Sequence, residues 1–398
     1  MSKIQQFAPQ IIWLLLATTL CMTYFVSNVV LFQIVLYSVV FVLFLLSSKT
    51  TLHSNIALCN VLFIVFGILY LVRAFIELKV LGHKQGLFNN DFSVLFFIAI
   101  GMILPALFVP SLKTTESYRI VFLIVATLIA VSLSISLYNI FSGNIIYTPD
   151  YRIQANKQLG VIEYGHLGLT GIITGFLSYL YYDKKILKLF GLLYITIGVF
   201  SMLMAGTRGA FFALFVIIAV FVFSKFQIKS FVVLALLIGV VIIFFDPIIN
   251  LFDSLGSHSV SRLVRFLTQG GDQSSGRFGI WKVALSQLSE SPFMGVSCFF
   301  NMRKSVYVYN YVHNSLIEVA YALGVVGLFV FLQLNCVAFK ATIVAIKSRH
   351  VDSIAFALLY LQYFTFVFFS SSIIRVPLFW FFLSMMLNVR NKQLKNEF

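Results

Sequence analysis

Two arginines and one histidine are the side chains best suited to chemistry in this sequence of 398 residues. Arg208 lies in the short stretch Gly206–Gly209, Arg277 follows two serines and a glycine, and His313 precedes an asparagine and a serine. A guanidinium group binds phosphate or carboxylate through two parallel hydrogen bonds. An imidazole with a pKa near neutrality can take a proton from a hydroxyl group. Together these residues predict a site that holds an anion and activates a hydroxyl group.

Each of the three residues also has a structural alternative. Arg208 could be an arginine at a membrane interface that extends its charged head towards water. The helix that follows Arg277 could be an amphipathic scaffold whose arginine is merely solvated. His313 could serve packing alone, as lone histidines often do.

Five further residues are candidates for supporting roles. Glu318 lies five positions after His313, roughly 140° round a helix, so it is not expected to orient His313 from within that helix. It could instead face the interior of a helix bundle, where an ionisable group is a functional candidate by default. The remaining four are Asn314, Arg262, Arg265 and Arg152.

The amino-acid composition indicates whether water or lipid surrounds the protein that carries these residues. Hydrophobic residues make up 60% of the chain, charged residues only 10%, and the mean hydropathy is +0.99. Soluble domains carry about 25% charged residues, so lipid must cover most of the exterior and the backbone must form helices. The net charge of +15 comes from short cationic clusters between apolar runs, a pattern that suits a membrane face rather than nucleic acid.

The apolar runs predict an all-α, polytopic integral membrane protein that forms one transmembrane domain over residues 1–398. Runs long enough to cross a bilayer, roughly 17–25 residues, give about twelve spans. They lie near 9–26, 29–47, 55–76, 92–110, 119–140, 165–182, 186–205, 209–224, 230–246, 314–339, 353–370 and 374–390. The longest exterior segment is 247–312.

The distribution of cations predicts the orientation of the spans. With the N-terminus inside, 15 cations face the cytoplasm, and both termini are cytoplasmic. The inside cations are 12 Lys and 3 Arg, whereas the outside ones are 8 Arg and 5 Lys. Lysine suffices as a solvated charge, and arginine is the better ligand for phosphate. The outer face is therefore predicted to bind an anion.

The long exterior segment is predicted to contain an amphipathic helix from Phe278 to Glu290. A serine at 274 or 275 would cap it and Pro292 would end it. Arg277 would then stand at the positive N-terminal end of a helix, which is a common anion site. The apolar face expected to lie on the membrane surface comprises Ile280, Trp281, Ala284, Leu285 and Leu288.

The sequence lacks the patterns of several other kinds of site. It shows no nucleotide-binding glycine loop, no paired-carboxylate metal signature and no zinc spacing, so neither a metal nor a cofactor is expected. The four cysteines are scattered, which disfavours a disulfide framework. Cys298 lies alone in the long exterior segment and is expected to react with a membrane-impermeant thiol reagent.

In their order and spacing these motifs resemble the O-antigen polymerase and O-antigen ligase superfamily. The resemblance covers roughly residues 165–340 and rests on three stretches. They are Ala205–Ala210, Gly276–Gly295 with Arg277, Trp281 and Pro292, and His313–Leu316 running on to Gly327. The stretch Met294-Gly295-Val296 departs from the doubled small-residue turn that is more usual there, which leaves the local turn uncertain.

The resemblance implies a metal-independent glycosyltransferase in the bacterial inner membrane with a periplasmic active site. Arg208 and Arg277 would bind the diphosphate of a polyprenyl-diphosphate-linked oligosaccharide, and His313 would activate the acceptor. The favoured activity is O-antigen polymerase in lipopolysaccharide biosynthesis. Partners would include membrane lipid, a polysaccharide chain-length regulator and a flippase, but no nucleic acid.

Two rival functions stay open. An O-antigen ligase would transfer the glycan to a lipid A core sugar instead of another lipid-linked repeat unit. A glycolipid transporter or flippase would need cations along a central cavity and repeat symmetry between its halves. No internal repeat is evident, and nearly all cations lie at the ends of spans.

Overall fold

A computed structural model describes most of the chain as two compact units. The described residues are 58–87, 90–108, 115–143, 146–147, 153–154, 160–181, 183–225, 247, 250, 277–304, 307–348 and 350–394. Unit 1 comprises Met1–Val121, Ser274–Thr342 and Val367–Phe398, and unit 2 comprises Phe122–Gln273 and Ile343–Phe366. The spans predicted at 9–26, 29–47 and 230–246 lie outside the described residues.

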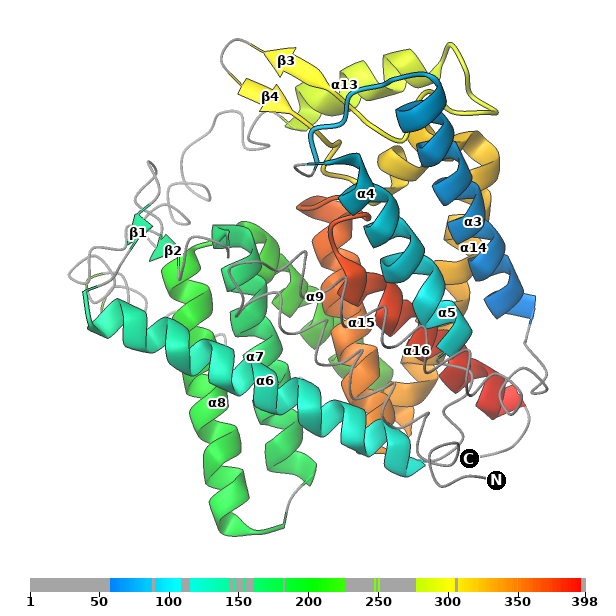
Figure 1. The fold of residues 1–398 in the computed structure, drawn as a ribbon. Coiled ribbons are helices and arrows are strands. Elements are labelled where there is room, and N and C mark those ends of the chain that lie inside the picture. Colours follow the sequence, from blue (N-terminus) through cyan, green and yellow to red (C-terminus); the bar gives the residue numbers. More distant parts are fainter. Residues whose placement is uncertain are drawn as a thin grey trace, which may run out of the picture. The chain divides into compact units, whose positions relative to one another are not determined.

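The elements follow the predicted spans closely where the two can be compared (Figure 1). Unit 1 contains α3 (Leu58–Phe75) with the π-helical turn η1 (Ile76–Val80), α4 (Asp91–Ile98), η2 (Ala99–Ile103), α5 (Leu104–Phe108), α13 (Arg277–Leu288), most of α14 (Ser315–Lys347) and α16 (Pro377–Leu394). Unit 2 contains most of α6 (Thr115–Phe141), α7 (Val161–Tyr181), α8 (Lys185–Ala205), α9 (Arg208–Lys225) and most of α15 (Val351–Phe369).

Three helices among these are long and apolar enough to cross a bilayer. They are Leu58–Val80, Lys185–Ala205 and Ser315–Lys347. Five shorter apolar helices accompany them within the described ranges: Asp91–Leu107, Ala126–Phe141, Arg208–Ser224, Ser353–Phe369 and Pro377–Val389. The structure thus supports a helical membrane protein, and the number of twelve spans stays a prediction.

Two short hairpins interrupt the helical architecture. In unit 2, β1 (Ile146–Tyr147) pairs antiparallel with β2 (Ile153–Gln154), and in unit 1, β3 (Met302–Lys304) pairs antiparallel with β4 (Tyr307–Tyr309). In the second hairpin Met302 stands opposite Tyr309. The β3–β4 hairpin and α13 lie across one end of α3, α4 and α14 (Figure 1). We refer to this end as the hairpin end of unit 1.

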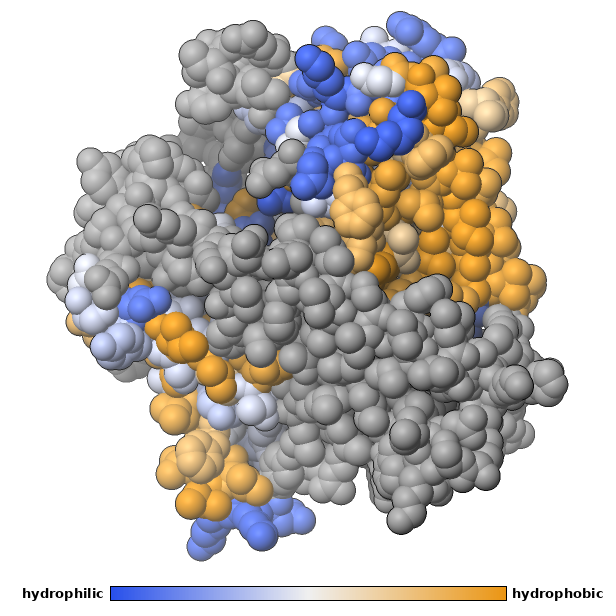
Figure 2. Space-filling model, viewed as in Figure 1, coloured by the Kyte–Doolittle hydropathy of each residue, from blue (hydrophilic) through white to orange (hydrophobic). Residues whose placement is uncertain are grey.

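The surface of unit 1 separates apolar from polar residues along the helices. Figure 2 shows a hydrophobic surface on the side where α3 and α14 lie, and hydrophilic residues gathered at the hairpin end. Exposed apolar side chains on these two helices include Val61, Val65, Leu69, Val72, Val325, Val326 and Phe329. An apolar surface of this kind beside a polar end is what lipid contact requires.

Aromatic rings form the core of unit 1. The indole of Trp380 lies 5.5 Å from the ring of Phe63, 5.7 Å from that of Phe66 and 6.1 Å from that of Phe331, measured between centroids. All four side chains are at most 1% exposed. Because they come from α3, α14 and α16, they hold together helices that are far apart in the sequence.

Helix α14 is broken near its hairpin end by a glycine. Gly324 has φ 66° and ψ −167°, which no other residue type adopts readily. The break frees backbone groups, and the turn after α13 satisfies them. Val296 N–H donates to Tyr321 O at 2.6 Å, and Val325 N–H donates to Pro292 O at 2.8 Å. Irregular backbone is thereby buried against protein rather than lipid.

Gly295 is the second glycine that this contact requires. Its φ is +76°, and a Cβ placed on it would lie 2.7 Å from Gly324 N and 2.8 Å from Tyr321 O. The turn that the sequence left uncertain is therefore a close backbone-to-backbone contact. Only glycine fits at both positions of this contact, Gly295 and Gly324.

In unit 2, α7 and α8 approach each other through glycines. A Cβ on Gly168 would lie 2.7 Å from Gly198 O, and a Cβ on Gly191 would lie 2.7 Å from Gly175 O. Small residues at such spacing let the backbones of two membrane helices touch, and dispersion contacts then hold the pair.

The glycine contact at the α14 break predicts a specific loss of stability. Gly324→Ala should lower the free energy of unfolding by roughly 2–5 kcal/mol, because the cost of a positive φ and the overlap with the Phe293 carbonyl add together. Gly82→Ala is the matched control, since Gly82 has φ +66° but nothing within 4 Å of its Cβ position. It should lower that free energy by only about 1–2 kcal/mol.

Thermal unfolding of the two variants in detergent, followed by fluorescence-detected size-exclusion chromatography, measures the difference. If Gly324→Ala and Gly82→Ala lowered the thermal stability equally, the close contact between the turn after α13 and α14 would be contradicted.

Candidate active site

Arg277 and His313 lie together at the hairpin end of unit 1, where both contact the turn between α15 and α16. Arg277 is the first residue of α13, and its Nη1 donates a hydrogen bond to the carbonyl oxygen of Phe369. Nδ1 of His313 lies 3.3 Å from the carbonyl oxygen of Ser370. Because these two carbonyls are adjacent in the chain, the two side chains predicted from the sequence are brought together.

Glu318 holds that turn in place through hydrogen bonds. Its buried carboxylate accepts hydrogen bonds from the hydroxyl of Ser372 and, at 3.2 Å, from the backbone N–H of Ile373. The indole N–H of Trp380 donates to the carbonyl of Ile373 at 2.7 Å. Glu318 therefore faces the interior, one of the alternatives the sequence left open. It acts on His313 only through the turn.

The backbone and ring of His313 are held in an unusual way. Its φ of 59° is the one positive value at a non-glycine position in the part of the chain that the structure describes. Such a conformation costs about 1–3 kcal/mol and persists where the surroundings impose it. The ring of Tyr311 stands against the imidazole with 4.1 Å between centroids. The contact of Nδ1 with the Ser370 carbonyl favours a proton on Nδ1 and leaves Nε2 as an acceptor.

The surroundings of His313 favour its neutral form. Burial is the largest of the causes that lower the pKa of His313 to about 4; the positive charges of Arg277 and Arg375 act in the same direction, and the hydrogen bond to the Ser370 carbonyl opposes them. A neutral imidazole is the form that can accept a proton.

Asn314 has a structural role. Its Oδ1 accepts hydrogen bonds from Leu316 N–H at 3.0 Å and from Ile317 N–H at 3.2 Å. These bonds cap the first turn of α14. Asn314 is predicted from the sequence to have a supporting role, and in the structure it stabilises the start of the helix that follows His313.

Arg208 belongs to unit 2 and starts α9. Helix α8 ends at Ala205, Gly206 takes a left-handed conformation with φ 55°, and α9 begins at Arg208. The tight connection predicted here is confirmed. Arg208 is half-buried beside the buried Thr207. That Arg208 shares one substrate with Arg277 and His313 stays a prediction.

The helix predicted at 278–290 is confirmed as α13. Ile280 and Ala284 are buried against Phe300, Val312 and Tyr321, so this part of its apolar face packs on protein. Leu285 is 50% exposed, and contact of the helix with the membrane surface stays a prediction. The indole N–H of Trp281 donates to Val312 O at 3.0 Å, which ties α13 to the residue before His313.

Several predicted features lie outside the described residues. They are the capping serines 274 and 275 and the supporting residues Arg152, Arg262 and Arg265.

A partly buried ion pair that the sequence analysis did not predict anchors the segment between α13 and the hairpin. Nε of Arg73 lies 2.9 Å from Oε1 of Glu77. Glu77 Oε2 accepts from Cys298 N–H at 2.9 Å and from the Ser297 hydroxyl. The Arg73 guanidinium donates to backbone carbonyls in the turn, including that of Val296 at 2.9 Å. The spacing of Arg73 and Glu77, four residues apart in an apolar run, was the available signal.

The expectation that Cys298 is accessible is wrong. Cys298 is only 4% exposed and belongs to the segment whose backbone Glu77 holds. Burial raises the pKa of the Cys298 thiol well above its ordinary value. The thiol is therefore protonated and shielded, and a membrane-impermeant reagent on Cys298 does not report topology.

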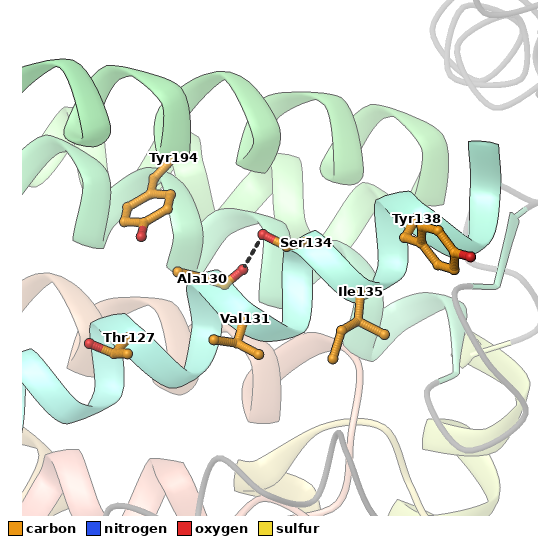
Figure 3. A pocket seen from close by; sticks show the side chains of 7 residues that line it. All are labelled: Thr127, Ala130, Val131, Ser134, Ile135, Tyr138 and Tyr194. Carbon is orange, nitrogen blue, oxygen red and sulfur yellow. Dashed lines mark hydrogen bonds between the residues drawn. The ribbon is translucent and has the colours of Figure 1, made fainter. Parts of the chain in front are cut away.

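An open groove in unit 2 is lined by α6 and by one residue of α8 (Figure 3). Its volume is about 370 Å³, and the hydroxyl of Ser134 donates along its own helix to Ala130 O at 2.8 Å. The lining residues are Thr127, Ala130, Val131, Ser134, Ile135, Tyr138 and Tyr194. None of these is charged, so the groove has no group that could neutralise an anion.

Nothing in the described part of the chain assembles a metal site. No group of three or more His, Cys, Asp or Glu side chains within it is placed to hold a metal ion. The metal independence expected from the sequence stays a prediction.

The fold and the hairpin end define a helical membrane protein with arginines and a histidine gathered at one polar end. A model of the O-antigen ligase family matches residues 192–332, roughly a third of the chain, and confirms the resemblance to the O-antigen ligase and polymerase superfamily. The matched region contains Arg208, Arg277, His313 and Glu318. It supports an activity of the O-antigen ligase or polymerase type, carried out by glycosyltransferase-like enzymes. No curated protein matches the sequence.

The burial of His313 predicts the pH range in which its imidazole takes up a proton. Because its folded pKa is depressed from 6.5 to about 4, the imidazole should stay neutral as the pH falls from 7 to about 5, and only then take up a proton. NMR of histidine-labelled protein in micelles measures this, with the signal assigned by its loss in His313→Gln. A midpoint near 6.5 would contradict the environment described for this ring.

The position of Glu318 predicts a graded loss of transfer activity. Glu318→Ala leaves the Ser372 hydroxyl and the Ile373 N–H without an acceptor and should loosen the turn that holds Arg277 and His313. Leaving a buried donor unpaired costs about 1–3 kcal/mol. Glu318→Gln keeps one acceptor oxygen and should retain more activity than Ala at equal membrane levels. Equal activity in the two variants would argue against a positioning role.

Proposed function

We propose that the protein is an O-antigen polymerase that transfers glycan repeat units from a polyprenyl diphosphate to a lipid-linked acceptor at the periplasmic face. The observation that carries the proposal is the contact of Arg277 and His313 with successive carbonyls, those of Phe369 and Ser370. This contact supports a site in which an anion-binding group and a neutral base act on one substrate.

The proposed reaction forms one bond and breaks another. The acceptor hydroxyl oxygen attacks the anomeric carbon of the donor glycan while Nε2 of His313 takes the hydroxyl proton. The bond from that carbon to the phosphate oxygen breaks, and its electron pair leaves with the polyprenyl diphosphate. The leaving group gains one negative charge, which Arg277 and Arg208 stabilise. The glycosyl–phosphate bond is already activated, so the step requires no nucleotide.

The environment of His313 supports the base assignment over a purely structural one. A histidine that only filled space would not need to be held at φ 59° with Nδ1 against a carbonyl. The low pKa of His313 keeps the ring neutral near pH 7, so Nε2 carries no proton before the reaction.

A ligase is the second candidate, because the family whose model matches is described as O-antigen ligase. The two functions differ in the acceptor. A strain that lacks the protein should carry lipid A core capped by a single repeat unit if the protein is a polymerase. Uncapped core together with accumulated long polymer would instead identify a ligase.

Purified protein in liposomes with lipid-linked glycan separates both enzymes from a transporter. Formation of longer glycans supports the polymerase. Transfer only when lipid A core is supplied supports the ligase. Movement of the glycan across the bilayer without new bonds would contradict both enzyme proposals.

Substitutions of the two side chains should remove activity without removing the protein. Loss of a charged partner of a buried anion costs about 2–5 kcal/mol, which is roughly 30- to 5,000-fold in rate. Arg277→Ala should fall in that range, and Arg277→Lys should recover little because a lysine cannot bind two phosphate oxygens through a planar fork. His313→Ala should be comparably inactive.

Lys282→Ala is the matched control, because Lys282 is an exposed cation on the same helix as Arg277. It should keep normal activity in the liposome assay at equal protein levels. Full activity in His313→Ala would remove the general-base assignment.

A further inference from the structure

The turn between α15 and α16 carries a cation that lies outside the matched region and that no motif of the sequence singled out. Arg375 follows the residues held by Glu318, and its backbone N–H donates to Ser372 O at 3.1 Å. Two residues later Pro377 starts α16. The same turn thus supplies the carbonyls that hold Arg277 and His313 and also presents a third charged side chain.

The guanidinium of Arg375 is close to the imidazole of His313. It lies 5.9 Å from the centre of the Tyr311 ring, and that ring stands 4.1 Å from the ring of His313. The charge of Arg375 is near enough to help lower the pKa of His313. Arg375 and Arg277 therefore act on the same imidazole.

No carboxylate neutralises Arg375 within the described residues. The ion pairs found there join Arg73, Lys79 and His83 to acidic partners, and Arg375 is in none of them. The side chain of Arg375 is exposed, whereas Glu77 and Glu318 of the same unit are buried and hydrogen-bonded to other groups. An exposed guanidinium held over an aromatic face is oriented but not neutralised.

We propose that Arg375 is a third arginine of the donor site and binds a phosphate group of the lipid-linked diphosphate beside His313. This inference rests on the proposed function. A glycosyl diphosphate has two phosphate groups and becomes more negative when the glycan leaves. A guanidinium commonly pairs with one phosphate group through two parallel hydrogen bonds, so the two phosphate groups offer contacts to more than one arginine. The rigid turn keeps Arg375 positioned before the substrate arrives.

The test uses the purified full-length protein in nanodiscs of phosphatidylcholine with inorganic pyrophosphate as the probe. Isothermal titration calorimetry of Arg375→Ala should give a Kd weaker by about tenfold or more, which corresponds to at least one lost charged contact. Arg375→Lys should fall between that variant and the wild type. Lys282→Ala, which removes an exposed cation from the same end, should bind pyrophosphate as the wild type does.

A second readout follows the imidazole itself. Pyrophosphate should raise the pKa of His313 in the wild type by opposing the charges of Arg277 and Arg375, and should raise it less in Arg375→Ala. Arg375→Ala without ligand should also have a higher His313 pKa than the wild type. A purely structural role for Arg375 predicts neither change.

The outcomes separate this inference from the proposed function. Weaker pyrophosphate binding in Arg277→Ala but not in Arg375→Ala would overturn the role of Arg375 and leave the donor site intact. Unchanged pyrophosphate binding in Arg375→Ala, with loss of binding to nanodiscs that contain phosphatidylglycerol, would assign Arg375 to a lipid headgroup and also overturn it. No pyrophosphate binding in the wild type would contradict the proposed donor site itself.

Discussion

The candidate site depends on one buried carboxylate, that of Glu318. A charged or polar group inside a helical membrane protein is expensive unless its hydrogen bonds are complete. Glu318 completes them with the hydroxyl of Ser372 and the N–H of Ile373. That requirement fixes the turn between α15 and α16. The turn in turn offers its preceding carbonyls to Arg277 and His313. The two candidate site residues thus contact backbone carbonyls of one turn, and hydrogen bonds to the buried carboxyl group of Glu318 hold that turn in place.

At the hairpin end, hydrogen bonds also satisfy backbone groups that the break in α14 leaves without helical partners. Helix α14 must begin directly after His313 and Asn314 and also make room for the turn after α13. Its break at Gly324 exposes a carbonyl and an N–H that would be unpaired in lipid, and the turn at Pro292–Val296 pairs with both. The Arg73–Glu77 pair then fastens the other side of that turn to α3. Irregular backbone is tolerated because every exposed group finds a protein partner.

The sequence predicted the elements better than the contacts between them. Hydropathy located α3, α7, α8 and α14 because lipid imposes a length and an apolar composition on each span. Arg277 and His313 could be selected because their residue types suit few roles at the end of a span. Arg375 could not be selected in the same way, since it begins an apolar run and its meaning depends on Tyr311, 64 positions earlier. Cys298 was misjudged for the same reason: a polar segment can still be buried once Glu77 binds its backbone.

The preference for arginine at the predicted outer face has a consequence for the base as well as for the anion. Guanidinium groups near an imidazole keep it neutral, which is useful before the reaction, but they also weaken it as a base. In the proposed site, a diphosphate bound beside Arg277 and Arg375 would oppose their positive charges and raise the pKa of His313 towards the range in which an imidazole transfers protons efficiently. Binding of the glycosyl diphosphate donor would therefore make His313 a stronger base for the transfer of the glycan. If an acceptor hydroxyl entered this proposed site before the donor, it would meet an imidazole that is a weak base. The positive charges of Arg277 and Arg375, which would attract the donor diphosphate, would therefore also disfavour deprotonation of the acceptor while the donor is absent.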